Sequence, residues 1–336
     1  MMKLNLDEAR QLGESALQAL GYGQKDAETI ADHIIDSEER GYHYAGLARI
    51  LSLADRFAGE KAASPGSASE KPACTTTITR ETPSSAQIDG NDTLGYLVAL
   101  EAVELACKKA KETGIAVVGA NNTWYTGMLS YYAEICARND LVCLIASNAS
   151  PWVAPHGGYE PRFGTNPICI GFPTKSVPVI WDIGTSPMIH AQAVMAQRLG
   201  QQIPPNMAYN ASGELTLDPA EALDGAFTVW GGHKGSCLAI CVQLLGVLAG
   251  SPAMPPNLKD FGFLIVAIKP DLFRPLEEFK SEIEGYGEIM RNSAPLPGQG
   301  PLRMPFERSN AQRAKVIERG YIEIDEHLVA ALRQLK

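Results

Sequence analysis

Three segments in the middle of the chain combine cationic and acidic side chains with turn residues. They are APHGGYEPRFGTNPICIGFP (154–173), DIGTSPMIHAQ (182–192) and GGHKGSCLAI (231–240). Arginine, lysine and histidine can hold an anionic substrate, and a glycine-rich turn that opens an apolar helix can present backbone amides to an anion. The cationic candidates are His156, Arg162, His190, His233 and Lys234, and Asp182 is the acidic candidate.

Several classes of protein are disfavoured by the rest of the sequence. No GxGxxG follows a strand and no GxxxxGK[ST] is present, so the common nucleotide-binding motifs are missing. A net charge of −9 without a basic patch disfavours a nucleic-acid partner. The seven cysteines form no CxxC pair and mostly lie in apolar runs, which predicts buried reduced thiols and no metal site.

The elements that must position these side chains follow from hydrophobic periodicity. The first fifty residues are predicted to be helical, with Asn5 as a cap and Glu8 three residues later. The stretch 62–72 is the best linker candidate, and short strands alternate with helices after it. The outline predicts an α/β protein with a helical domain from both chain ends, residues 1–72 plus 271–336, against an α/β domain of residues 73–270.

Two further helices are predicted in the body of the chain. An amphipathic helix is expected to begin at a Thr93 cap and to stop at Gly114. The apolar stretch from Cys237 to Gly250 is shorter than the ~20 residues that a membrane span needs, which predicts a buried core helix. With no secretory segment in view, the sequence predicts a cytoplasmic protein without membrane contact.

Taken in order, the three segments resemble those of the malate/L-lactate dehydrogenase family. That family includes ureidoglycolate dehydrogenase, diketogulonate reductase and the piperideine/pyrroline-2-carboxylate reductases. The resemblance extends from the N-terminal helices to at least Arg308. It implies a non-Rossmann fold in which a largely antiparallel sheet domain binds NADPH or NADH, with NADPH slightly preferred. It also implies a homodimer, with the helical domain as the dimerisation domain and a small-molecule substrate near the interface.

The resemblance carries cofactor contacts onto particular residues. MPFERSNAQR (304–313) matches a segment that closes over the nucleotide in the family; here Phe306 replaces a glycine. Lys175 could reach a phosphate, although an exposed lysine after a strand is the ordinary case. The implied cofactor contacts are Thr126, Gly127, Met128, Leu129, Pro173, Thr174, Lys175, Leu223, Asp224, His233, Lys234, Glu307 and Arg308.

The stretch RGYHYAGLARI (40–50) departs from the family where its chemistry is expected. Family members carry Ser-His-Gly followed three residues later by an arginine. The histidine gives a proton to the carbonyl or imine being reduced, and the arginine holds the substrate carboxylate. Gly46 and Arg49 match, but Tyr44 and Ala45 stand at the serine and histidine positions. Because hydride addition to a ketone makes an alkoxide, another acid is needed for that substrate.

Other side chains could supply the proton. Tyr125 matches a position that acts as acid/base in some members and is the first candidate; the alternative is an aromatic packed beside Trp124 and Tyr131. Asp182 matches the carboxylate that pairs with the family histidine, and it could orient another donor, bind an iminium or water, or serve structure alone. The remaining catalytic candidates are His43, Tyr44 and His190.

Substrate contacts are expected at Arg49, Ala45 and His156. A guanidinium fits a carboxylate bidentately, which favours Arg49; the alternative is an ion pair with Asp36 or Glu39. His156 could instead be hydrogen-bonded to loop backbone. The change from Ser-His to Tyr-Ala adds an aromatic wall beside a small hole, which suits a bulkier or more apolar substrate.

The sequence therefore predicts an NAD(P)H-dependent reductase of a 2-oxo acid, a cyclic imine or a related compound. A ketimine is protonated more readily than a ketone, so the histidine vacancy favours an imine. The alternatives are a 2-hydroxy-acid dehydrogenase that works oxidatively with Tyr125 as base, and a redox-inactive member that binds a ligand or catalyses a non-redox step.

Overall fold

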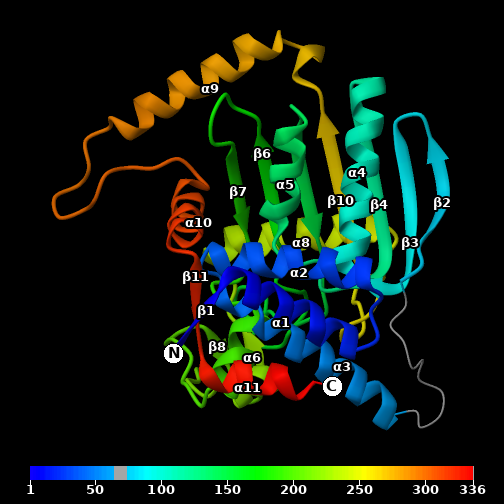
Figure 1. Cartoon of the computed structure of the whole chain (residues 1–336), viewed down its shortest axis with the longest axis vertical. Helices are drawn as coiled ribbons and strands as arrows, with labels where there is room; N and C mark the ends of the chain where they lie inside the picture. The colour runs from blue at the N-terminus through cyan, green and yellow to red at the C-terminus, as the bar shows by residue number, and fades with distance from the viewer. Residues whose placement is uncertain (64–73, 336) are drawn as a thin grey trace.

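The computed structural model describes residues 1–63 and 74–335, and its centre is a seven-stranded sheet (Figure 1). Only β3 and β4 run parallel, and every other neighbouring pair is antiparallel. The predicted non-Rossmann, largely antiparallel sheet is therefore confirmed. In spatial order the strands are β2 (Thr77–Thr82), β3 (Ser85–Leu94), β4 (Ile115–Trp124), β10 (Phe261–Ile268), β5 (Val142–Ser147), β6 (Ile168–Phe172) and β7 (Val179–Ile183).

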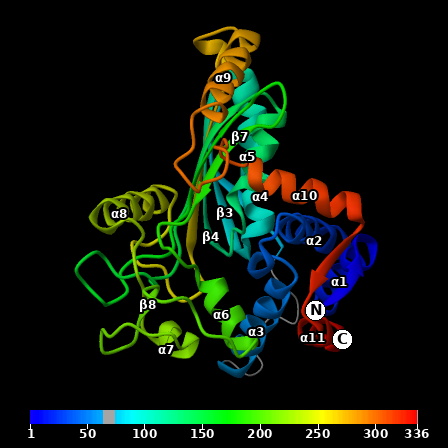
Figure 2. The same cartoon turned by 90° about the vertical axis from the view of Figure 1, so that its left-hand side faces the viewer.

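Helices cover both faces of this sheet. Helices α4 (Gly95–Thr113) and α5 (Leu129–Arg138) pack on one face, and α8 (Gly232–Leu248) lies on the opposite face (Figure 2). The expected stop of α4 at Gly114 is confirmed, because Gly114 follows its last turn with φ +86°. The expected cap is wrong: Thr93 lies in β3, which continues to Leu94 and pairs with β4 up to that point.

The two ends of the chain meet in a second layer. Strand β1 (Met2–Asn5) pairs antiparallel with β11 (Tyr321–Ile324), and the side chain of Asn5 accepts the Glu8 N–H at 2.8 Å as predicted. Their shared core includes Leu17, Ile34 and Leu328. The helices of this layer are α1 (Leu6–Ala19), α2 (Gln24–Glu39), η1 (His43–Ala45), α3 (Ala48–Ala63) and α11 (Glu326–Gln334). Most of the expected linker, residues 64–72, lies outside the described residues.

Two further groups of elements complete the chain. Helix α10 (Glu307–Arg319) packs on α2, while α9 (Leu276–Arg291) crosses near the end of the sheet that carries the β6–β7 turn (Figure 1). A small unit with its own core packs beneath the sheet. It consists of α6 (His190–Arg198), β8 (Ala208–Tyr209), α7 (Pro219–Asp224) and β9 (Ala226–Phe227). Elsewhere in the chain, the short helix η2 (Pro270–Leu272) precedes α9.

Helix α8 corrects two expectations from the sequence. It is only half buried, because Ile240, Leu244 and Leu248 lie exposed along one face together with Cys237 and Cys241. The expected buried core helix is therefore wrong in part, and the expected burial of the cysteines is confirmed for four of the seven. The sequence of a helix that is apolar on all sides does not show whether the helix is buried in the core of its own chain or against a partner. Within the described residues, no helix has both the length and the apolar character to span a membrane.

Candidate active site

A cavity of about 350 Å³ lies where the N-terminal helices meet the sheet. Its walls come from η1 and the start of α3, the turn between β4 and α5, the end of β7, the start of α6 and the start of α10. The structure brings together there, from segments far apart in sequence, the predicted residues Tyr44, Ala45, Arg49, Tyr125, Thr126, Gly127, Met128, Leu129, Asp182, His190 and Arg308.

Other predicted site residues lie outside this cavity. His156 and His233 are exposed near the start of α8, with ring centroids 6.2 Å apart, and Lys234 is exposed beside them. The backbone N–H of His156 donates to Ser236 Oγ at 3.2 Å, which is a different contact from the expected hydrogen bond between the histidine side chain and loop backbone. The remaining ones occupy the β6–β7 turn (Pro173, Thr174, Lys175), the end of α7 (Leu223, Asp224) and the start of α10 (Glu307).

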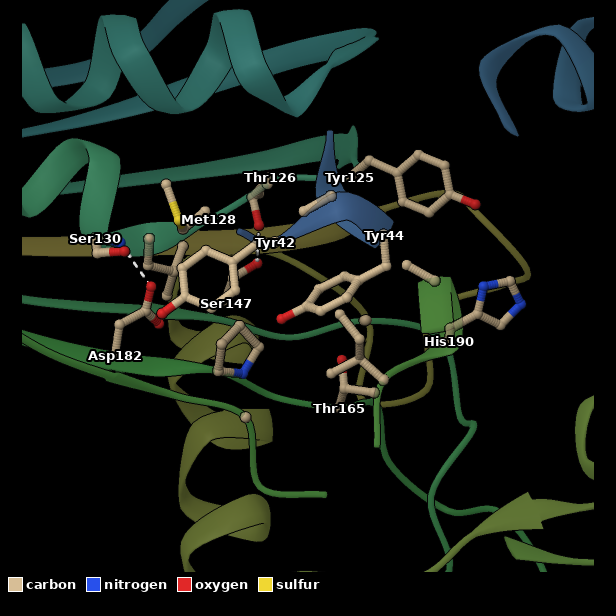
Figure 3. A pocket seen from close by; sticks show the side chains of 18 of the residues that line it. Tyr42, Tyr44, Tyr125, Thr126, Met128, Ser130, Ser147, Thr165, Asp182 and His190 are labelled. Atoms are coloured by element: carbon tan, nitrogen blue, oxygen red, sulfur yellow. Dashed lines mark hydrogen bonds between the residues drawn. The ribbon is translucent and has the colours of Figure 1, made fainter. Parts of the chain in front are cut away.

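Asp182 caps helix α5. Its carboxylate accepts the Ser130 N–H at 2.7 Å, in the first turn of that helix (Figure 3). Burial raises the pKa of Asp182, and the N–H groups of Ser130 and Leu129 offset part of the rise. Anions are stabilised at helix N-termini, so the first turn of α5 stabilises the Asp182 carboxylate in the cavity wall. Asp182 has this partner although the chain has alanine at position 45, where the family has the histidine that pairs with the carboxylate. Among the described residues, no cationic side chain pairs with Asp182.

Arg49 lies flat on an aromatic ring inside the cavity. Its guanidinium carbon is 4.1 Å from the ring centroid of Tyr125, and its Nε and Nη1 atoms are buried without a hydrogen-bond partner in the described structure. The alternative ion pair with Asp36 or Glu39 does not form, because Arg40 and Arg313 occupy those carboxylates. Buried unpaired donors on an arginine are suited to receive an anion such as a carboxylate.

Tyr125 owes its position to an unusual backbone. It has φ +49°, in the left-handed region, and its ring packs on Trp124 at 5.5 Å. Its hydroxyl is directed toward the side of the cavity where His190 lies, away from Asp182 (Figure 3). The expected packing beside Trp124 is present, whereas Tyr131 packs on His33 instead. Tyr125 therefore both packs on Trp124 and lines the cavity.

Tyr44 and His190 face the cavity with different protonation properties. Burial and the neighbouring Tyr42 and Asp182 raise the pKa of Tyr44 to about 12, so its hydroxyl stays protonated. Burial and the charges of Arg49 and Arg198 lower the pKa of His190 to about 3, so its imidazole is neutral. The His190 ring stacks on Trp152 at 4.2 Å, and its Nδ1 is buried without a partner in the described structure.

His43 points away from the cavity and holds the preceding segment in place. Its Nδ1 lies 2.6 Å from Glu38 Oε2, and the other oxygen of Glu38 accepts the Leu47 N–H at 2.8 Å. The hydrogen bond to Glu38 raises the pKa of His43. A Cβ at Gly46 would lie 2.1 Å from Glu38 Oε1, so this arrangement requires glycine there.

The sequence analysis missed His33, which supports the turn between β4 and α5. Its Nε2 accepts the Met128 N–H at 2.9 Å, and burial together with the charge of Arg40 lowers its pKa to about 3. Gly127 has φ +73°, and a Cβ there would lie 2.7 Å from the same Nε2. A histidine on the apolar face of an amphipathic helix was the only signal in the sequence.

Phe306 takes a conformation that normally favours glycine. It precedes α10 with φ +78°, lines the cavity, and lies with its ring centroid 4.5 Å from the guanidinium carbon of Arg40. A left-handed phenylalanine is strained by about 1–2 kcal/mol. The cation–π contact with a fully buried arginine offsets part of that cost.

Comparison with known proteins places this fold and site in one family. The family model for malate/L-lactate dehydrogenase matches residues 4–333. The chain is 31% identical to L-sulfolactate dehydrogenase of Methanothermobacter thermautotrophicus, covering 98% of this chain and 94% of that protein. It is 30% identical to Delta(1)-pyrroline-2-carboxylate reductase 1 of Burkholderia ambifaria, covering 94% and 93%. A dehydrogenase structure from Sinorhizobium meliloti superposes with a TM-score of 0.89 at 29% identity, covering 99% and 98%.

The family match identifies the protein as an oxidoreductase, and its largely antiparallel sheet shows that it has no Rossmann domain. The chain belongs to the malate/L-lactate dehydrogenase family, as its ordered motifs predict.

Proposed function

We propose that the protein reduces a cyclic 2-imino acid with a hydride from NAD(P)H. The proposal is carried by two opposite charges in one cavity: the Arg49 guanidinium with two unpaired buried donors, and the Asp182 carboxylate. A protonated ketimine acid carries a positive nitrogen and a negative carboxylate bonded to the same carbon. One molecule therefore complements both side chains.

Arg49 binds and orients the substrate carboxylate in this proposal. Its Nε and Nη1 atoms each carry a buried N–H without a partner in the described structure, and guanidinium N–H groups donate strong hydrogen bonds to carboxylate oxygens. The Tyr125 ring supports the guanidinium from below, so the plane of the bound carboxylate is fixed. Asp182 faces the iminium nitrogen and stabilises its positive charge.

An iminium substrate also accounts for alanine at position 45. Hydride addition to an iminium leaves a neutral amine, so no enzyme acid is needed at that step. A 2-oxo acid needs one, and Tyr125 is the proposed donor because the Arg49 charge lies beside the phenolate that would remain. Tyr44 is a weak acid, since burial and the neighbouring Tyr42 and Asp182 raise its pKa. His190, which is neutral, contributes a buried polar atom that can contact substrate.

The residues proposed to hold the nicotinamide cofactor fit such a group. The backbone of Thr126, Gly127, Met128 and Leu129 forms one wall of the cavity, and Arg308 lies at its rim. When bound, the reduced nicotinamide supplies the hydride. A cofactor that reached the β6–β7 turn would extend along the edge strand β7. We propose that NADPH is slightly preferred over NADH and that the protein is cytoplasmic, as expected from the sequence.

Reduction of a dianionic oxo acid is the second candidate. Arg308 also lines the cavity, and it could receive the second anionic group of a malate-like or sulfolactate-like compound. Relatives named for both kinds of substrate align over more than nine tenths of the chain. The two candidates differ in the charge that faces Asp182.

Oxidation of NADPH and NADH by the purified protein tests the proposal. We expect Delta(1)-pyrroline-2-carboxylate and its six-membered analogue to give a kcat/KM at least about tenfold above that of oxaloacetate, sulfopyruvate or pyruvate. Higher activity with either dianion would favour the second candidate. Binding of neither cofactor in a fluorescence titration would leave the redox-inactive alternative.

We further propose that the exposed apolar face of α8 is covered by a second copy of the chain. Ile240, Leu244 and Leu248 lie on one stripe, which suits a self-complementary contact. This proposal puts the dimer contact on α8, whereas the resemblance to the family implied the helical chain ends as the dimerisation domain. Leu244→Glu should convert the dimer to a monomer in sedimentation experiments, whereas the same change at exposed Ile78 on β2 should not.

A further inference from the structure

A second pocket, of about 720 Å³, adjoins the cavity on the far side of the start of α10. We call it the α9–α10 pocket. Its walls come from the C-terminal ends of α2 and α9, from the loop before α10, and from the first turns of α10 itself. Its charged residues are Arg40, Arg291, Arg303, Glu307, Arg308 and Lys315.

The charges in this pocket are unbalanced. The single carboxylate, Glu307, is occupied by Arg291 at 2.6 Å and by the Met304 N–H at 2.9 Å. Arg303 and Lys315 form no ion pair within residues 1–63 and 74–335. In a protein with net charge −9, such a local excess of cations repels itself unless an anion binds there.

Arg40 adds a buried donor to the wall of the pocket. Its side chain is fully buried, and it binds Asp36 through Nε and Glu134 through Nη2, both at 2.7 Å. Its Nη1 is buried and has no hydrogen-bond partner in the described structure. An unpaired guanidinium N–H beside free cations is the setting in which a phosphate group is bound. The N-terminus of α10 contributes further positive potential.

Arg308 lines both the α9–α10 pocket and the cavity, so one elongated ligand can occupy the two. We propose that the α9–α10 pocket binds the 2′-phosphate of NADPH and thereby selects NADPH over NADH. The inference rests on the proposed cofactor chemistry of the adjoining cavity. The pocket itself is defined by its affinity for a phosphate dianion, whether that group is part of the cofactor or free.

Dissociation constants of NADPH and NADH for Arg303→Gln, Lys315→Gln and the double variant test the proposal. We expect each single change to weaken NADPH binding roughly tenfold and the double change to weaken it further, while the dissociation constant of NADH changes less than about twofold. The difference should shrink at high salt because these cations are exposed. Arg80→Gln, which removes an exposed cation from β2 at the opposite edge of the sheet, should change neither cofactor.

The assignment to the 2′-phosphate would be overturned if the variants bound NADPH and NADH equally more weakly. It would also be overturned if the binding of neither cofactor became weaker. Should the wild-type protein bind neither cofactor, the proposed function fails but the pocket can still be judged with inorganic phosphate. Phosphate should then raise the melting temperature of the wild type and of Arg80→Gln, but not of the double variant. An equal response of all three would overturn the anion site.

Discussion

The guanidinium carbon of Arg49 lies 4.1 Å above the centre of the Tyr125 ring, inside the cavity that also holds Asp182. The ring is itself held by a left-handed backbone and by Trp124. A group that binds anions and a group that can donate a proton are therefore one stacked unit. Changes to the hydroxyl can be separated from changes to the ring.

Tyr125→Phe keeps the stack and removes the hydroxyl. If Tyr125 donates the proton to oxo acids, kcat for an oxo acid should fall by at least about 100-fold, while kcat for a ketimine acid should change little. Steady-state rates with both substrates check this. Tyr131→Phe is the matched control, because the Tyr131 hydroxyl binds Asp32 outside the cavity. Near-normal oxo-acid turnover would reassign Tyr125 to packing.

Ala45→His places an acid in the wall of the cavity that also holds Asp182. We expect oxo-acid reduction to rise by about 100-fold or more, since general acid catalysis contributes that much. The measurement is kcat/KM for oxaloacetate and for the ketimine acid. No gain with oxo acids would mean that the vacancy at position 45 does not select the substrate.

Asp182→Asn removes the negative charge but leaves an oxygen that can accept the Ser130 N–H. Because burial raises the pKa of Asp182, ketimine reduction should fall with decreasing pH, beginning above the ordinary titration range of an aspartate near 4. The variant should lose that dependence and most of its kcat/KM. Its melting temperature should stay close to the wild-type value. A pH profile of the variant identical to that of the wild type would show that Asp182 takes no part in ketimine reduction.

Phe306 allows backbone strain to be measured directly. Both Phe306→Ala and Phe306→Gly lose the contact with Arg40, but only alanine keeps a Cβ at φ +78°. We expect the alanine variant to be less stable than the glycine variant by about 1 kcal/mol, the reverse of the usual order. Urea unfolding midpoints check this, and the opposite order would contradict the strained backbone.

His43 should make stability depend on pH. Its pKa is raised in the folded state by Glu38, so its contribution is fully present below the unfolded value near 6.5 and is lost as pH rises through the folded value. His33 and His190 have lowered pKa values and act in the opposite sense, losing stability as pH falls below about 6.5. His43→Gln should therefore flatten only the alkaline part of the urea-midpoint profile. An unchanged alkaline limb would argue against the His43–Glu38 interaction.

Hydrophobic periodicity predicted the helices at the two chain ends, whereas the non-Rossmann sheet and most of the cavity residues were expected from the resemblance to the family. Arg49 and Asp182 were expected in one site because both match residues with roles in the family's active site. The cap that Asp182 makes on α5 could not be predicted, since it depends on how β7 packs beside a helix distant in sequence. The α9–α10 pocket was missed for the same reason, as Arg40 and Lys315 come from opposite ends of the chain.

Strand β1 also bears on how the chain folds during synthesis. Its partner β11 leaves the ribosome only after the whole sheet has been made, so Met2–Asn5 must wait as an unpaired edge. The start of α10, which closes the cavity, is made equally late. A nascent chain that ends before Tyr321 therefore lacks the partner of β1 and leaves that strand with an open edge, which favours aggregation. Chaperone dependence should be greatest for such truncated chains.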